Sequence, residues 1–134
     1  VIDTGSEATM GNAVLRARVL GGRHPPATVK VTLVSVTGQS VVADLAILPE
    51  MTIGGLTLHN VPVAFADAPP FRLFGLDQEP AMLLGTDLLE TFRRVSLDFA
   101  RRRVRFSLRE RDRNATQGLS VATAWQPWRI VQPN

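Results

Sequence analysis

The segment Asp3-Thr4-Gly5-Ser6 is the strongest candidate for a chemically active group in this sequence. A carboxylate can accept or donate a proton, and a neighbouring glycine lets the backbone turn tightly beside it. The preceding Val1-Ile2 indicates the end of a buried strand that runs into Asp3. Asp-Thr-Gly alone is weak evidence, because chance alone would place this tripeptide in roughly 2–4% of chains of this length.

A second segment, far along the chain, strengthens the first. Ala81-Met82-Leu83-Leu84 predicts a short buried strand that ends at Gly85. Thr86-Asp87 is suited to begin a helix, and we expect that helix over residues 87–94. Its apolar stripe would consist of Leu88, Leu89 and Phe92.

Together the two segments resemble the retropepsin-like and pepsin-like aspartic proteases, and most closely their bacterial single-domain members of clan AA type. The first segment looks like their catalytic loop. Leu84-Gly85-Thr86-Asp87 looks like the apolar-apolar-Gly segment that passes under that loop. The Ile53-Gly54-Gly55 turn and the closing SLDFARRRVRFSL are similar to the bacterial members. The resemblance covers about residues 1–108.

The resemblance implies a hydrolytic role for Asp3, as half of a pair of aspartates that share one proton and activate a water molecule for peptide hydrolysis. The Thr4 hydroxyl would bond across two such loops, Gly5 would allow the turn, and Ser6 would bond the outer oxygen of Asp3. The sequence holds one Asp-Thr-Gly only. The second aspartate must then come from another chain, so the resemblance implies a homodimer acting on polypeptides.

The same resemblance assigns the turn Thr37-Gly38-Gln39 as a flap that folds over substrate, although an ordinary hairpin turn explains these residues equally well. Alternating apolar residues predict a β-hairpin over residues 28–48 and a second one over residues 51–65. Pro62 indicates an edge position or a strand break in the second hairpin.

The fold class predicted is all-β, a retropepsin-like closed β-barrel with short helices at about 7–19 and 87–94. Residues 66–80 predict a long loop, and the last two strands are expected on either side of Arg101-Arg102.

The family fold has two strands before its catalytic loop, so the first strands are expected to be missing from this sequence. We predict one domain over residues 1–108, then a polar linker and a tail to residue 134 whose tryptophans, Trp125 and Trp128, indicate docking.

Composition narrows the classes of function. The 134 residues include no cysteine, which excludes disulfides and thiolate chemistry, and the two histidines, His24 and His59, lie in separate segments. We therefore predict no metal site and no cofactor. No apolar run approaches the roughly 18 residues that span a bilayer, so we expect no membrane insertion. By resemblance, a periplasmic or membrane-associated location is the expectation, and the residues themselves leave the compartment open.

The net charge of +3 and the pI near 10.9 come almost entirely from arginine, part of it in the run Arg101–Arg105. Such a run attracts nucleic acid or anionic lipid in some proteins. Here apolar residues alternate with arginines, which favours a strand with one solvated cationic face.

Three hypotheses about function remain. The first is an aspartic endopeptidase, and the second is a catalytically inactive retropepsin-like domain that binds peptide or dimerises. The third, an arginine-rich domain that binds nucleic acid, is the one we favour least, so we do not expect a nucleic-acid partner.

Overall fold

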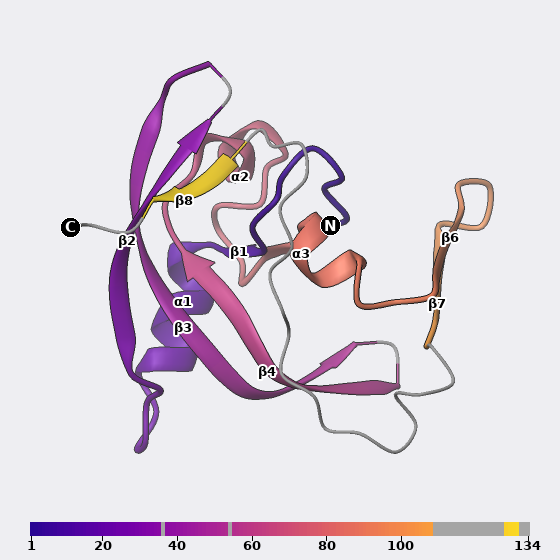
Figure 1. Cartoon of the computed structure of the whole chain (residues 1–134), viewed down its shortest axis with the longest axis horizontal. Coiled ribbons are helices and arrows are strands. Elements are labelled where there is room, and N and C mark those ends of the chain that lie inside the picture. Colours follow the sequence, from indigo (N-terminus) through magenta and orange to yellow (C-terminus); the bar gives the residue numbers. More distant parts are fainter. Residues whose placement is uncertain (36, 54, 109–127, 132–134) are drawn as a thin grey trace.

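The structure is a computed structural model that describes residues 1–35, 37–53, 55–108 and 128–131, the last four by their backbone (Figure 1). The strands are β1 (Met10–Gly11), β2 (Thr28–Ser35), β3 (Ser40–Ile53), β4 (Leu56–Phe65), β5 (Met82–Leu83), β6 (Arg94–Asp98), β7 (Arg103–Ser107) and β8 (Trp128–Val131). The helices are α1 (Ala13–Leu20), α2 (Pro69–Leu73) and α3 (Thr86–Leu89). Strands predominate over short helices, which confirms the predicted all-β class.

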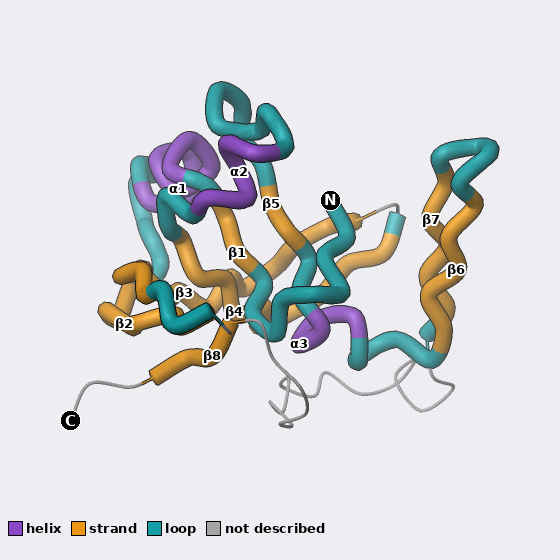
Figure 2. Tube along the Cα trace, turned by 90° about the horizontal axis from the view of Figure 1, so that it is seen from above, coloured by secondary structure: helices purple, strands orange, loops and turns teal. Residues whose placement is uncertain are grey.

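Six of the strands form one sheet, in the order β5-β1-β4-β3-β2-β8. β2, β3 and β4 follow one another as an antiparallel meander, and β1 lies parallel to β4 through Met10 and Gly11. β6 and β7 form a separate two-stranded sheet, which stands apart from the main sheet in both views (Figures 1 and 2). Closure of the main sheet into a barrel stays a prediction.

The helix predicted over residues 7–19 is shorter than expected, and its predicted start is wrong. α1 begins after Asn12, whose side chain accepts a hydrogen bond from the Leu15 N–H at 2.8 Å. Upstream of this cap the chain is extended and enters the sheet as β1. The helical spacing of Met10 with later residues was therefore misleading, because Met10 is fully buried as a strand residue.

The helix predicted over residues 87–94 also ends early, at Leu89. The backbone N–H groups of Thr91 and Phe92 each bond a carbonyl three residues earlier, so the helix tightens into turns. The Arg93 N–H then donates to the Ser107 carbonyl at 2.8 Å, beside the first β6–β7 pair. Pairing with β7 therefore takes residues 93 and 94 out of the helix. The two closing strands themselves were predicted correctly.

The two predicted hairpins prove to share one long strand, because β3 continues through Pro49. The β3–β4 ladder pairs Leu48 with Val61 and Glu50 with His59, and it skips the step between them. Pro49 has no N–H to donate, and Asn60 opposite it has a left-handed φ of 54°. Pro62 likewise lies within β4 without breaking it, beyond the two residues that pair with β1.

Two further segments differ from expectation in detail. The predicted loop over residues 66–80 contains the short helix α2, whose Phe71 is buried. β8 of the tail pairs with the outer edge of β2, where Ser35 lies opposite Trp128. Trp125 and the predicted linker lie outside the described residues, and the domain boundary at residue 108 stays a prediction.

Within the part of the chain that the structure describes, no helix has the length and apolar character needed to span a membrane.

The hydrophobic core is divided between the two faces of the sheet. Alternate residues of β4 point to opposite faces, so Ala64 belongs to one cluster while Val63 and Phe65 belong to the other. The first cluster also contains Phe71 of α2. The second is covered by Leu15 and Val19 of α1, by Leu88 of α3, and by Val95 and Phe106 at the base of the β6–β7 hairpin.

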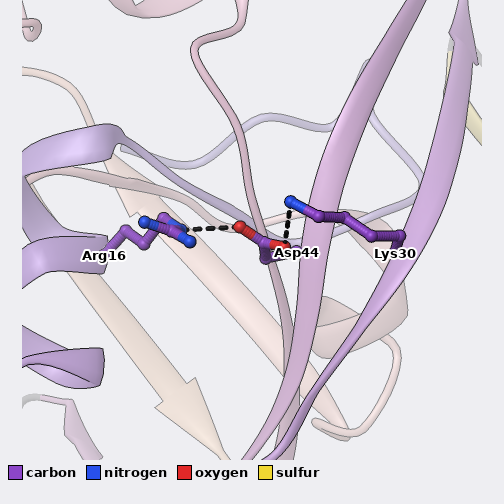
Figure 3. A network of polar contacts seen from close by, with 3 residues as sticks. All are labelled: Arg16, Lys30 and Asp44. Atoms are coloured by element: carbon purple, nitrogen blue, oxygen red, sulfur yellow. Dashed lines mark hydrogen bonds and ion pairs between the residues drawn. The ribbon is translucent and has the colours of Figure 1, made fainter.

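A buried carboxylate, Asp44 in the middle of β3, ties α1 to the sheet (Figure 3). Lys30 Nζ of β2 lies 2.6 Å from Asp44 Oδ1, and Arg16 Nε of α1 lies 2.7 Å from Asp44 Oδ2. The hydrogen bond from Lys30, with a smaller contribution from Arg16, holds the pKa of Asp44 below its usual range, although burial acts in the opposite direction. Asp44 is the buried charge of this network, and the side chains of Arg16 and Lys30 both reach solvent. The network therefore orients α1 without burying either cation.

We predict that Asp44→Asn lowers the free energy of unfolding at pH 7 by about 1 kcal/mol, since the two cations remain solvated when the charge is lost. The folded-state pKa of Asp44 is depressed, so its contribution is present above the unfolded pKa and is lost as the pH falls from about 4 through the folded pKa. Urea unfolding of both proteins from pH 7 to pH 2.5 measures this. A difference that persists unchanged at the lowest pH contradicts the assignment.

The matched control is Asp67→Asn, which removes a carboxylate paired with Arg72 at the surface. Both of those side chains are more than half exposed. An exposed pair of this kind contributes little, so we expect a change below about 0.5 kcal/mol.

Candidate active site

Asp3 lies in a tight turn whose backbone is fixed on both sides. Its own N–H donates to the Leu84 carbonyl at 3.0 Å, and the Ser6 N–H donates to the Asp3 carbonyl at 3.3 Å. The carboxylate Oδ1 accepts the Gly5 N–H at 3.0 Å. Asp3 is half-buried while Thr4 and Gly5 are exposed, so the carboxylate sits at the surface on a rigid support.

Ser6 does not occupy the role that the resemblance assigned to it. Its side chain is fully buried, and the hydroxyl donates to the Ala8 carbonyl at 2.9 Å. The bond holds the chain where it leaves the turn at Asp3-Thr4-Gly5 and approaches β1. The predicted bond to the outer oxygen of Asp3 is therefore wrong in this structure, because burial points the hydroxyl toward the backbone behind the turn.

The second sequence segment runs directly against the first. Leu84 forms an isolated parallel bridge with Ile2, and its N–H donates to the Val1 carbonyl at 2.8 Å. The Thr86 and Asp87 N–H groups, in the first turn of α3, donate to the carbonyls of Ser6 and Glu7 at 2.8 and 2.9 Å. The structure thus brings Leu84, Gly85, Thr86 and Asp87 together with the turn that carries Asp3.

Thr9 and Asp87 form the side-chain link between the two segments. Asp87 Oδ1 accepts the Thr9 hydroxyl at 2.6 Å, and Oδ2 accepts the Thr9 N–H at 3.0 Å. The Thr9 hydroxyl in turn accepts the Gly85 N–H at 3.1 Å. Burial raises the pKa of Asp87 above its usual range, although the bonds from Thr9 and Leu88 lower it. A raised pKa means that this carboxyl favours the folded chain most at acidic pH, and the contribution is lost as the pH rises through that pKa.

Gly85 permits this close approach of two backbones. A Cβ atom at this position would lie 2.5 Å from the Ala8 carbonyl carbon and 2.8 Å from the Glu7 oxygen. These are backbone atoms of the segment that follows the Asp3 turn, so the close approach cannot be relieved by rotating a side chain. The glycine of the second motif is therefore required by packing.

The turn Thr37-Gly38-Gln39 joins β2 to β3 and is fully exposed. Ser35 organises it: its N–H donates to the Gln39 carbonyl at 2.8 Å, and its carbonyl accepts the Gly38 N–H at 3.0 Å. Gly38 has a φ of 84°, a conformation that favours glycine. Its role as a flap stays a prediction.

The chain belongs to a known family on the strength of its sequence. A family model described as aspartyl protease matches residues 1–88, a range that contains both segments of the site. The chain is a member of the aspartyl protease family. The family lies in the retropepsin-like clan, as the resemblance implied, and its members are hydrolases that act on polypeptides. No curated protein and no solved structure matches the chain.

The sequence contains one Asp-Thr-Gly segment, Asp3-Thr4-Gly5. In the described residues no hydrogen bond joins the Asp3 carboxylate to a second carboxylate, and no group of three or more histidine, aspartate or glutamate side chains is placed to hold a metal ion. Sequence reasoning missed the supporting residues Thr9 and Asn12, both buried. A polar residue directly before an apolar helical run was the available signal for Asn12. No local sequence pattern indicated the role of Thr9, because its partner Asp87 lies 78 residues away.

We predict that Gly85→Ala destabilises the fold by about 2–4 kcal/mol, because the added methyl group forces apart the backbones of the two site segments. Gly22→Ala is the matched control, since a Cβ there meets nothing closer than the Val19 oxygen at 4.0 Å. Thermal unfolding followed by circular dichroism compares the two. Equal melting temperatures for the two variants would show that the close packing at Gly85 is unimportant.

Proposed function

We propose that this protein is an aspartic endopeptidase whose active site contains Asp3 and the Asp3 of a second copy of the chain. The observation that carries the proposal is the Asp3-Thr4-Gly5 turn, braced by the segment from Leu84 to Asp87 in a chain of the aspartyl protease family. One carboxylate alone does not supply both the acid and the base that this hydrolysis needs.

A two-fold axis beside the turn supplies the missing group. Such an axis makes identical surfaces meet, so each Asp3 faces its own mate and each Thr4 reaches the neighbouring loop. The exposure of Thr4 and Gly5 supports this arrangement, because the turn is open to a partner on that side. The homodimer is therefore part of the proposed mechanism.

The chemistry follows from the repulsion between two like charges. Two carboxylates about 3 Å apart do not both ionise near neutral pH, so the pair holds one shared proton and titrates as a unit. The ionised member accepts a proton from a water molecule, whose oxygen attacks the scissile carbonyl. The protonated member donates a hydrogen bond to the carbonyl oxygen as negative charge develops there. The Gly5 N–H bond to Oδ1 orients the carboxylate for this task.

The turn at Thr37, Gly38 and Gln39 is proposed as the flap. It is an exposed hairpin tip with a glycine at positive φ, which suits a segment that must change conformation around an extended peptide. In closing it would exclude water from the scissile bond and offer backbone groups to the substrate.

The test is cleavage of a mixed peptide library from pH 3 to pH 8 by the wild type and by Asp3→Asn. We expect wild-type cleavage to be blocked by a statine-type inhibitor and to fall at least about 100-fold in Asp3→Asn, since the variant loses the general base. Glu50→Gln, an exposed acid on β3, is the control and should cleave like the wild type.

Equal cleavage by the wild type and Asp3→Asn would remove Asp3 from the mechanism. A folded, dimeric wild type that binds peptides and cleaves none at any pH would favour the inactive peptide-binding alternative.

A further inference from the structure

The β6–β7 hairpin, residues 94–107, has one apolar face that extends beyond the core. We call this hairpin the β6–β7 arm. Its register places Val95 opposite Phe106 and Leu97 opposite Val104. Because side chains two residues apart on a strand share a face, these four lie together on one side of the arm.

Among the described residues, the packing against this apolar face reaches only its base. Val95 and Phe106 pack against the second core cluster, where the Phe106 ring lies 4.7 Å from that of Phe92. Farther out, Leu97 is 44% exposed and Val104 is 41% exposed. Phe99, in the turn at the tip, is 85% exposed. An isolated two-stranded hairpin is marginally stable in water, so a partner on the outer half would stabilise it.

The opposite face of the arm is polar and cationic. Arg94, Ser96, Arg105 and Ser107 alternate with the apolar residues and are exposed. Among the described residues, the one ion pair of the arm joins Arg101 to Asp98 at its tip, at 3.1 Å. The arm therefore has one face suited to water and one suited to a protein surface.

The position of the arm connects it to the candidate active site. The N-terminus leads into the turn at Asp3-Thr4-Gly5, which is proposed above as catalytic. The N-terminus and α3 lie on the side of the molecule that faces the arm in both views (Figures 1 and 2). A partner that approaches the catalytic turn from this side therefore also meets the arm.

We propose that the outer apolar face of the β6–β7 arm docks on a second copy of this chain and holds the dimer that completes the active site. The inference rests on the proposed function, because the need for a second Asp3 is what selects another copy as the occupant. Around a two-fold axis Leu97 and Val104 of one chain contact the same region of the other, while the arginines of the opposite face remain in water and do not repel one another at the contact.

The test measures the dimer dissociation constant by sedimentation velocity over a range of protein concentrations. Leu97→Glu places a charge in the proposed contact and should weaken the dimer at least about 10-fold. Ser96→Glu adds the same charge one residue away on the solvated face and should leave the constant unchanged. Circular dichroism confirms that both variants keep the fold. Phe99→Ser, a milder change at the tip, should weaken the dimer without disturbing β6–β7 pairing.

Three outcomes would overturn the inference. In one, the wild type dimerises and Leu97→Glu dimerises equally well, so the interface lies elsewhere. In another, Leu97→Glu and Ser96→Glu weaken the dimer equally, so the effect is general electrostatics. In the third, the wild type stays monomeric and binds a polyanion with steep salt dependence, so the arm serves a nucleic acid or anionic surface. Peptide cleavage assayed in parallel separates the first two results from a failure of the proposed function, because a wild type that dimerises and cleaves peptides retains the Asp3 pair whatever the arm does. A monomeric wild type contradicts both proposals.

Discussion

The contact between the segment from Leu84 to Asp87 and the chain around residues 1–9 is the constraint on which the rest of the site depends. It consists almost entirely of backbone hydrogen bonds, completed by the Thr9–Asp87 pair. These bonds fix the turn that carries Asp3, while the Asp3 side chain stays partly exposed. Because the two segments come from opposite ends of the family domain, forming the site requires that the domain between them fold.

The intervening sheet explains how the two ends are brought together. β1 pairs with β4 on one side and with β5 on the other. This two-residue strand therefore connects the Asp3 turn both to the β2–β3–β4 meander and to the segment from Leu84 to Asp87. Asn12 reinforces this junction: its amide donates to the carbonyls of Leu76 and Glu79 at 2.7 and 2.6 Å. Local side-chain bonds and the sheet therefore position Asp3 jointly.

The sequence predicted those features whose signals are local. The Asp-Thr-Gly turn, the alternating strands, the turn at Gly38 and the Gly85 motif each depend on a few adjacent residues, and the all-β class and the family followed from them. The helix boundaries were wrong because Asn12 and the β6–β7 pairing end helical segments through contacts that apolar spacing does not report. The Thr9–Asp87 link and the Asp44 network join residues far apart in the chain, so no pattern in a single sequence reveals them. The bond expected from Ser6 to Asp3 failed for a related reason, since burial decides where that hydroxyl points.

Subunit mixing tests the proposal that one active site uses an Asp3 from each of two chains. Wild type and Asp3→Asn are combined at constant total concentration, allowed to exchange subunits, and assayed for peptide cleavage. If both aspartates of a dimer are needed, activity falls with the square of the wild-type fraction, to about a quarter in an equal mixture. A fall to only about a half would mean that each Asp3 acts independently, and retention of about three quarters would mean that one Asp3 per dimer is sufficient. Either result would contradict a site that needs both aspartates.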